Sequence, residues 1–524
     1  MEEQMILQQP AQPQTQAVCA PPKPEIKRFD RVFVLIAAFL GFLFVRYTLF
    51  NFNGFFTTAS VILTFVCCAV YVMMCGKRPT AVQWAMGGMI CAFAFTYSIT
   101  SSPLLHILCT LFLIAAMFWW VQAVVIRARF VTKFFPADLL KTIFVQPFLD
   151  FTGAFRAFTA HKSAGNGKPG AAKPIIAGLV ITLPLTFIVA GLLASADSGI
   201  QNIFSRILVS LAEEDIAVLI YQMIFTVPAG LILFGMLRAD AKQKMYPLPS
   251  DYFYHTKAAE LKKIGNLGIY AGVTPVCLLY LLYVFSQTQY FFSAFSGKVP
   301  GSLLYSEYAR RGFFELCFIA VINLGVILFM LTFSKKSGSE STPALKTYTL
   351  IICGFTLFII STALAKMLLY ISKYGLTRLR LYTSWFMVLL AAVFVTLAVR
   401  AFVKKLPTAK IITAVFIVLF GALCFTRPDA LITEYNIQKY LDGEHETLDT
   451  DMLATLSDDA YLAALKYAES GMFEKSGRRN AEYYRTEIVN MCGQSVESYG
   501  DHPMLSRSFP AQELKALYER VSGT

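Results

Sequence analysis

The chain has 524 residues, of which 56% are hydrophobic and 15% are charged. Soluble domains carry roughly 25% charged residues, so this composition indicates a membrane protein and argues against a soluble enzyme. The net charge of +13 does not indicate nucleic-acid binding, because the basic excess is confined to the chain before residue 426 and the remainder is acidic. We therefore expect no nucleic-acid partner.

Apolar runs dominate the chain up to residue 425. Residues 1–30 are rich in Gln, Pro and Ala and predict a disordered tail. Four apolar runs then occupy residues 31–126, a basic cytoplasmic loop follows at 127–173, and seven more runs fill residues 174–425. Each run has about 20 residues, the length that crosses a bilayer. We predict an all-α, polytopic membrane protein of about 11 spans: Val32–Phe50, Thr57–Cys75, Ala81–Ile99, Leu104–Ile126, Pro174–Ala194, Ile216–Leu237, Ile264–Phe285, Phe313–Phe333, Thr347–Tyr370, Tyr382–Val399 and Ile411–Phe425.

The distribution of charge between the loops predicts how the chain crosses the membrane. With a cytoplasmic N-terminus, the inner segments carry 27 Lys and Arg and the outer loops carry seven. Cytoplasmic loops of membrane proteins are enriched in these residues. We therefore expect the N-terminus inside and the acidic residues 426–524 outside. Amphipathic patterns predict that this C-terminal segment is a small helical soluble domain with helices at Leu448–Leu456, Asp459–Glu469, Asn480–Val496 and Pro510–Val521.

The basic loop at 127–173 contains aromatic and basic residues in amphipathic order. The segments ARFVTKFF and LDFTGAFRAF predict pieces that lie on the membrane surface near anionic lipid. Its glycine-rich end, at residues 165–170, matches the letters GxGxxG. No strand precedes it and Pro169 interrupts it, so we do not interpret it as a dinucleotide site.

Charged residues at the edge of one apolar run form the main candidate site. Glu307, Arg311 and Glu315 share one helix face, and Arg310 adjoins them. Lys366, in the following span, lies at a similar distance from the outer surface as Glu315. One interpretation pairs these two side chains as a coupled acid–base site in the membrane. The alternative is that Lys366 extends outward to water.

Two further polar residues are candidates. Asn323 lies in the middle of a span, and the residues next to it in the sequence are apolar. Asp197, outside the membrane, either caps a short surface helix or faces a cavity. Three spans carry prolines near their middle, which in transporters often mark helices that line a site: Pro184, Pro228 and Pro275.

Motifs for catalysis and for metal or cofactor binding are not found in the sequence. The five His are dispersed, and the eleven Cys include no CxxC pair. We find no GxSxG, HExxH or P-loop motif. We therefore expect no catalytic residues, no metal and no cofactor. The partners we expect are the lipid bilayer and a membrane or extracytoplasmic protein.

Several of these segments resemble one family. SEYARRGFFEL, at residues 306–316, is similar to the main signature of an uncharacterised bacterial membrane family, domain of unknown function forty-one seventy-three, whose sibling is forty-one fifty-three. The segment from Tyr374 to Tyr382, which includes Arg380, resembles its second signature, and residues 194–197 and 436–440 resemble weaker ones. Arg311 stands where the signature has an acidic residue. The resemblance covers roughly residues 174–460 and implies a multi-pass protein of the bacterial inner membrane with no established activity.

Two functional hypotheses remain from the sequence, with an enzyme acting on lipid-linked substrates as a weaker third. The first is a solute or ion transporter that uses the intramembrane Glu315 and Lys366. The second is a membrane sensor or assembly partner that displays its helical C-terminal domain outside the cell. The substrate or signal is not encoded in any recognisable motif.

Overall fold

The computed structural model describes residues 27–49, 54–132, 134–150, 153, 186, 189, 193, 214–242, 265–296, 313–334, 343–403, 406–499 and 507–522. Within these ranges the chain is helical. Nine of the described helices are long and apolar enough to cross a membrane, and Phe318–Phe333 forms a shorter apolar helix. The described part of the chain is therefore that of a polytopic α-helical membrane protein. The predicted span 174–194 lies almost wholly outside the described residues.

The first helix group is built from the N-terminal spans together with two later helices. Its buried side chains are mostly large and apolar, and Trp120, Tyr71 and Leu105 at its centre have no exposed surface. The last turns of the final span contribute Phe420, which stacks on Phe93. The group comprises α1 (Arg28–Phe44, continued by a π-turn at Val45–Leu49), α2 (Gly54–Met74), α3 (Ala81–Ala94), α4 (Thr96–Ile99), α5 (Pro103–Val125), α11 (Glu214–Lys242) and the end of α18 (Thr408–Phe425).

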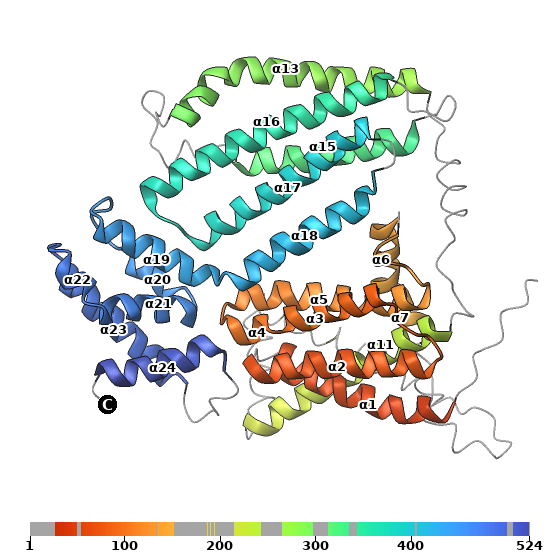
Figure 1. The fold of residues 1–524 in the computed structure, drawn as a ribbon, viewed down its shortest axis with the longest axis horizontal. Helices are drawn as coiled ribbons and strands as arrows, with labels where there is room; N and C mark the ends of the chain where they lie inside the picture. Colours follow the sequence, from red (N-terminus) through yellow and green to blue (C-terminus); the bar gives the residue numbers. More distant parts are fainter. Residues whose placement is uncertain are drawn as a thin grey trace, which may run out of the picture.

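The second helix group contains the remaining described spans. It comprises α13 (Asn266–Ser296), α15 (Phe313–Phe333), α16 (Pro343–Tyr374) and α17 (Arg378–Phe402), with a buried core of its own. Pro228 in α11 and Pro275 in α13 lie inside continuous helices. Figure 1 shows the first group below the second, with α18 between them.

The C-terminal bundle forms a third core. It comprises α19 (Pro428–Leu441), α20 (Thr450–Ala454), α21 (Asp458–Glu469), α22 (Met472–Lys475), α23 (Ala481–Glu497) and α24 (Phe509–Ser522). The four helices predicted from the sequence are present, but α19 and the short α22 were not expected. The first helix predicted within residues 426–524 began only at Leu448, whereas α19 begins at Pro428, with two residues between it and the end of α18.

The membrane helices have two distinct ends. The C-terminal bundle packs at one of them, which we call the tail end, and Figure 1 shows it at the left-hand ends of both groups. At the other end, the basic end, the hydroxyl of Tyr71 donates to Asp30 at 3.0 Å and Arg238 pairs with Asp150 at 2.9 Å. The exposed Arg127 follows α5 there. Two short helices, α6 (Phe135–Phe144) and α7 (Gln146–Leu149), complete this end.

Candidate functional site

Half of the residues predicted as a site fall outside the described part of the chain. Glu315 lies in the first turn of α15, but its side chain is not described. Asn323, Lys366 and Arg380 are described, in α15, α16 and α17 respectively. The residues outside the described ranges are Asp197, Glu307, Arg310 and Arg311.

Asn323 joins three helices of the second group. Its side chain is fully buried. The hydroxyl of Tyr280 on α13 donates to its Oδ1, and its Nδ2 donates to the Oγ1 of Thr356 on α16 at 2.9 Å. The ring of Tyr280 also stacks on Phe355. This chain of side-chain hydrogen bonds satisfies a polar group that would otherwise be costly in the membrane.

The hydrogen bond between Asn323 and Thr356, together with the helix directions, gives the relative depths of Glu315 and Lys366 along their helices. Thr274 on α13 bonds Tyr348 near the start of α16 at 2.6 Å, so α13 and α16 run in the same direction. Ser334 at the end of α15 donates to Asn266 at the start of α13 at 2.7 Å, so α15 runs in the opposite direction to both. Glu315 is eight residues before Asn323, about 12 Å along its helix, and Lys366 is ten residues after Thr356, about 15 Å along α16. The two residues are thus at similar depth, and their pairing remains a prediction.

Arg380 closes the turn between α16 and α17. Its Nη1 donates to the carbonyl of Tyr374 at 2.8 Å and to the carbonyl of Gly375. Its guanidinium lies 4.0 Å from the ring centroid of Tyr370. These contacts satisfy carbonyls at the C-terminus of α16, so Arg380 holds the turn that receives the C-terminal bundle.

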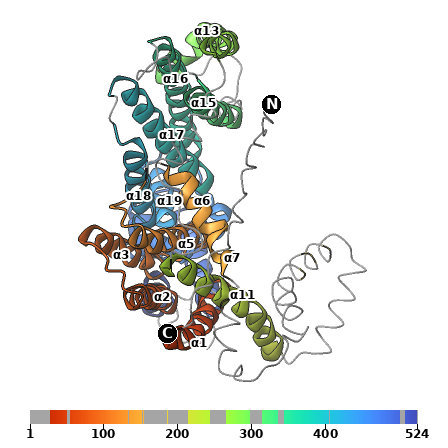
Figure 2. The same ribbon diagram turned by 90° about the vertical axis from the view of Figure 1, so that its right-hand side faces the viewer.

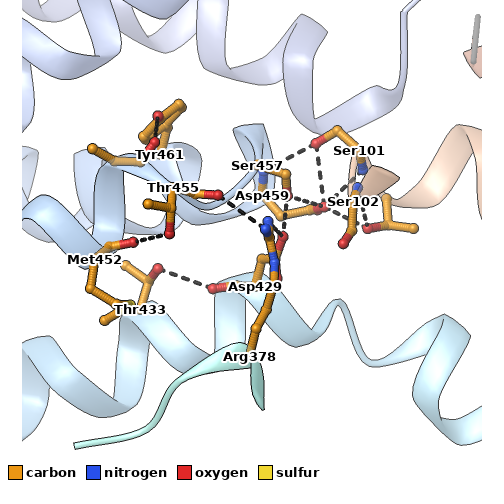
Figure 3. A network of polar contacts seen from close by, with 12 residues as sticks. Ser101, Ser102, Arg378, Asp429, Thr433, Met452, Thr455, Ser457, Asp459 and Tyr461 are labelled. Carbon is orange, nitrogen blue, oxygen red and sulfur yellow. Dashed lines mark hydrogen bonds and ion pairs between the residues drawn. The ribbon is translucent and has the colours of Figure 1, made fainter. Parts of the chain in front are cut away.

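The best-defined polar cluster lies where the C-terminal bundle meets the tail end, and Figure 3 shows it from close by. Asp429, in the first turn of α19, has no exposed surface. Both of its oxygens accept from Arg378 at the start of α17, at 3.0 Å from Nε and 2.6 Å from Nη2. Ser457 donates to the same carboxylate at 2.7 Å, and Arg378 also donates to the carbonyl of Thr455 at 3.0 Å. Arg378 therefore ties the second helix group to two helices of the bundle.

A second buried carboxylate makes the corresponding connection to the first helix group. Asp459, in α21, has no exposed surface. Its Oδ2 accepts from the Thr100 hydroxyl at 2.6 Å and from the backbone N–H of Ser101 at 2.8 Å, both in the turn between α4 and α5. Its Oδ1 accepts from the Nε of Arg427 at 2.7 Å. We call these residues, with Asp429, Arg378 and Ser457, the docking network.

Arg427 holds its position at a conformational cost. It adopts a φ of 52°, in the left-handed region that residues other than glycine rarely occupy. It lies between the end of α18 and Pro428, the first residue of α19. The sharp turn there directs α19 along the tail end, and the ion pair with Asp459 offsets the strain.

The docking network holds the C-terminal bundle against the membrane helices through balanced charges. Two carboxylates face two guanidinium groups, so the cluster is electrically balanced, and hydroxyl and N–H donors occupy the remaining acceptor positions. Removing one partner from such a cluster is costly because the other charge stays buried. Within the described ranges, no group of three or more His, Cys, Asp and Glu side chains is arranged to hold a metal ion.

Asn436 completes the attachment of the bundle. Its Oδ1 accepts from the N–H of Leu376 at 2.8 Å, and its Nδ2 donates to the carbonyl of the same residue at 2.8 Å. The neighbouring Gly375 has a φ of 78°, and a Cβ there would lie 2.5 Å from the Oδ1 of Asn436. The turn therefore requires glycine both for its backbone and for this close approach.

We expect Asn436→Ala to lower the free energy of unfolding of the C-terminal bundle by about 2 kcal/mol, because two hydrogen bonds to a buried turn are lost. Asn436→Asp should cost at least as much, since the carboxylate keeps the acceptor but repels the Leu376 carbonyl. Denaturant unfolding of the bundle in detergent, followed by hydrogen exchange, measures both. Equal stability of Asn436→Ala and the parent chain would contradict the assigned role.

Asp458, next to Asp459, gives the bundle a dependence on pH. Burial raises the pKa of this carboxyl, although Ser495 donates to it at 3.0 Å. An acid whose pKa is raised by folding binds more protons in the folded state, so its contribution to stability is present at low pH and is lost as pH rises through the folded pKa.

We therefore expect Asp458→Asn to stabilise the bundle at neutral pH, because the amide keeps an acceptor for Ser495 without a buried charge. The advantage over the parent chain should shrink as the pH falls toward about 4, the ordinary pKa of an aspartate. Melting temperatures of both proteins across this range test it. If the difference in melting temperature between Asp458→Asn and the parent chain grew as the pH fell, the proposed role of the buried carboxylate would be contradicted.

Comparison with known families now identifies the chain. Residues 87–467 match the family model described as Domain of unknown function (DUF4153). The chain belongs to this family. The match begins well before residue 174, where the sequence resemblance was expected to start, and the family is DUF4153 rather than forty-one seventy-three, whose signature the sequence resembles. No curated protein and no solved structure matches the chain.

The DUF4153 match contains every residue of the docking network, from Thr100 to Asp459. It also contains the two segments, 374–382 and 436–440, that resemble family signatures, and the bonds between Asn436 and Leu376 bring them together. These two segments could be recognised in the sequence, whereas Asp429 and Asp459 could not. Their signal was weak: an Arg-Pro-Asp after the last span and a Ser-Asp-Asp at a helix start.

Proposed function

We propose that this DUF4153 protein is a multi-pass protein of the bacterial inner membrane that senses or assembles with another protein through its C-terminal bundle. In this proposal the N-terminus is cytoplasmic, the bundle is extracytoplasmic, and the family is a sibling of forty-one seventy-three. The activity of the family itself is not established.

The proposed topology has 11 spans. Nine described helices qualify as spans, α15 would be a tenth, and the apolar run at 174–194 would be the eleventh. Support for the orientation comes from charge. The exposed Arg78, Arg127 and Arg129 lie in the turns that follow α2 and α5. Figure 1 shows α6 and α7, which follow the second of these turns, at the end away from the bundle. Basic residues favour the cytoplasmic side, so the bundle is assigned to the opposite side.

The observation that carries the functional proposal is the docking network. A bundle that served only as a tethered appendage would not need two buried carboxylates bonded to turns of both helix groups. Because Arg378, Thr100 and Arg427 belong to different membrane helices or turns, a force on the bundle acts on both groups at once. Such an arrangement is expected of a domain that binds a partner outside the membrane and whose binding is coupled to a conformational change of the membrane helices.

A photo-crosslinking amino acid at Tyr483, an exposed position of α23, tests this proposal in cells. We expect a discrete protein adduct, present also in the variant Asp451→Asn and lost in Asp459→Asn, which releases the bundle. Asp451 is an exposed acid of the same bundle and serves as the matched control. An adduct of equal yield in Asp459→Asn would show that docking is irrelevant to the partner, and no adduct from the folded protein would contradict the proposal.

A second candidate function is transport of a solute or ion through the second helix group. The buried chain Tyr280–Asn323–Thr356 favours it, because polar groups within membrane helices often line a pathway. In this proposal Glu315→Gln abolishes flux in reconstituted vesicles and leaves thermal stability unchanged. Flux that is insensitive to Glu315→Gln and to Asn323→Ala would exclude this use of the group.

A further inference from the structure

In the segment α6–α7, at the basic end, the polar side chains are buried and the apolar side chains are exposed. Its polar side chains face the protein interior: Asp138, Thr142, Gln146 and Asp150 are all buried and recur every four residues. The opposite face is apolar and exposed, with Phe144 at 66% of its full accessibility and Leu140 and Phe148 above one half. A helix at a water interface shows the reverse arrangement.

Specific contacts fix this segment against the membrane helices. Thr132 donates to Asp138 at 2.6 Å, and the ring of Phe135 packs edge-on against Trp119 of α5. At the other end, Asp150 pairs with the fully buried Arg238 of α11 at 2.9 Å. The buried polar face is therefore bonded to Thr132 in the preceding loop and to Arg238 of α11, while a ring contact holds the start of α6 against α5. These contacts leave the apolar face directed outward.

The orientation of α6 differs from that of the spans. In Figure 1 it stands upright at the right-hand ends of α3 and α5, which run horizontally. In Figure 2, which looks along those helices, α6 is seen from the side. The axis of α6 is therefore roughly perpendicular to those of the membrane helices. It lies in the plane that a membrane surface would occupy at the basic end.

Exposed arginines lie in turns at the same end of the membrane helices. Arg127 and Arg129 lie in the loop that leads from α5 into α6, and Arg78 lies in the turn between α2 and α3. Arg127 occupies the left-handed region, with a φ of 54°, at a helix end where glycine is usual. The combination of an exposed apolar face and neighbouring guanidinium groups matches an anionic lipid surface, in which phosphates lie directly above acyl chains.

We propose that α6–α7 is an in-plane element that binds anionic phospholipid: Leu140, Phe144 and Phe148 contact acyl chains while Arg127 and Arg129 bind headgroup phosphates. A membrane protein partner would explain the apolar face but not the neighbouring exposed arginines, and a soluble anionic ligand would explain the arginines but not the apolar face. This inference is independent of the proposed role of the C-terminal bundle.

The test uses the full-length protein with a photo-crosslinking amino acid at Phe144, reconstituted in vesicles of equal parts phosphatidylcholine and phosphatidylglycerol. We expect phospholipid adducts at Phe144 and none at Tyr483 in the bundle. Phosphatidylglycerol should be enriched about fivefold for each arginine in contact. Arg127→Gly should reduce the enrichment of phosphatidylglycerol. Glycine also relieves the strain of the positive φ at this position, so a reduced enrichment cannot be attributed to unfolding. Arg479→Gln, an exposed arginine of the bundle, should leave it unchanged.

Three outcomes would overturn the proposal. An adduct between position 144 and residues 151–213 of the same chain would mean that this segment covers the apolar face. An adduct with a second protein chain would assign the face to an interface between proteins. Lipid adducts in the proportions of the vesicle, unchanged by Arg127→Gly, would show contact with acyl chains but no recognition of anionic headgroups.

Discussion

Asp459→Asn releases the C-terminal bundle from the membrane helices. The substitution removes the negative charge that pairs with Arg427 and presents an amide to the donors of Thr100 and Ser101. Arg427 is then left partly buried without its counter-ion, while still held in a strained backbone conformation. Breaking one side of a buried ion pair costs about 3–5 kcal/mol. That is comparable with the total stability of many small domains, so docking should be lost.

Hydrogen exchange of residues 428–499 and of the Thr100–Ser102 turn in detergent micelles measures this release. The parent chain and the control Asp451→Asn should both protect α19 and α21, whereas Asp459→Asn should exchange at α19 and in the Thr100–Ser102 turn together. Adding Arg427→Gln to Asp459→Asn should recover part of the protection, since neither charge then remains. Unchanged protection in Asp459→Asn would mean that packing alone holds the bundle.

Gly41→Leu separates α1 from α11. A Cβ at residue 41 would lie 2.7 Å from the backbone nitrogen of Gly230 and 2.8 Å from the carbonyl oxygen of Thr226. Both are backbone atoms, so a rotamer change cannot relieve the clash. Small residues that allow such close approach are a common device in membrane helix pairs. We expect a loss of about 3 kcal/mol or more, at the upper end of the range for overpacking.

Thermal unfolding of purified protein in detergent measures this second effect. Gly88→Leu is the matched control, because Gly88 is exposed on α3 and a Cβ there meets nothing within 4 Å. The control should melt at or above the temperature of the parent chain, since leucine also favours helix. If Gly41→Leu melts with the control, the close crossing of α1 and α11 is not important for stability.

The membrane helices could be predicted from the sequence because the bilayer imposes a length and a polarity that single runs of residues reveal. Phe313–Phe333 matches α15 residue for residue, and the other described spans differ from their predicted bounds mainly at the ends. The grouping of the helices could not be predicted. α11 and α18 join the N-terminal spans through packing between distant residues, such as Phe420 on Phe93, which no local pattern encodes.

The candidate site was predicted less well, for a related reason. A charge inside an apolar run, such as Lys366, is conspicuous in a sequence, whereas Asp429 and Asp459 lie in a segment where acidic residues are common. Their importance comes from burial against Arg378, Arg427 and the Thr100 turn, which lie up to 359 residues away in the chain. Asn323 was predicted from the sequence as an intramembrane polar residue, and its partners Tyr280 and Thr356 became known only from the fold.

The side of the membrane on which the bundle lies is the central claim of the proposed function. Cys492 is fully buried and burial raises its pKa to about 12, so an introduced thiol at the exposed Tyr483 is the better reporter. We predict that a membrane-impermeant maleimide labels Tyr483→Cys in intact cells as strongly as in cells opened with detergent. Labelling that appears only after the cells are opened would place the bundle in the cytoplasm and contradict the account.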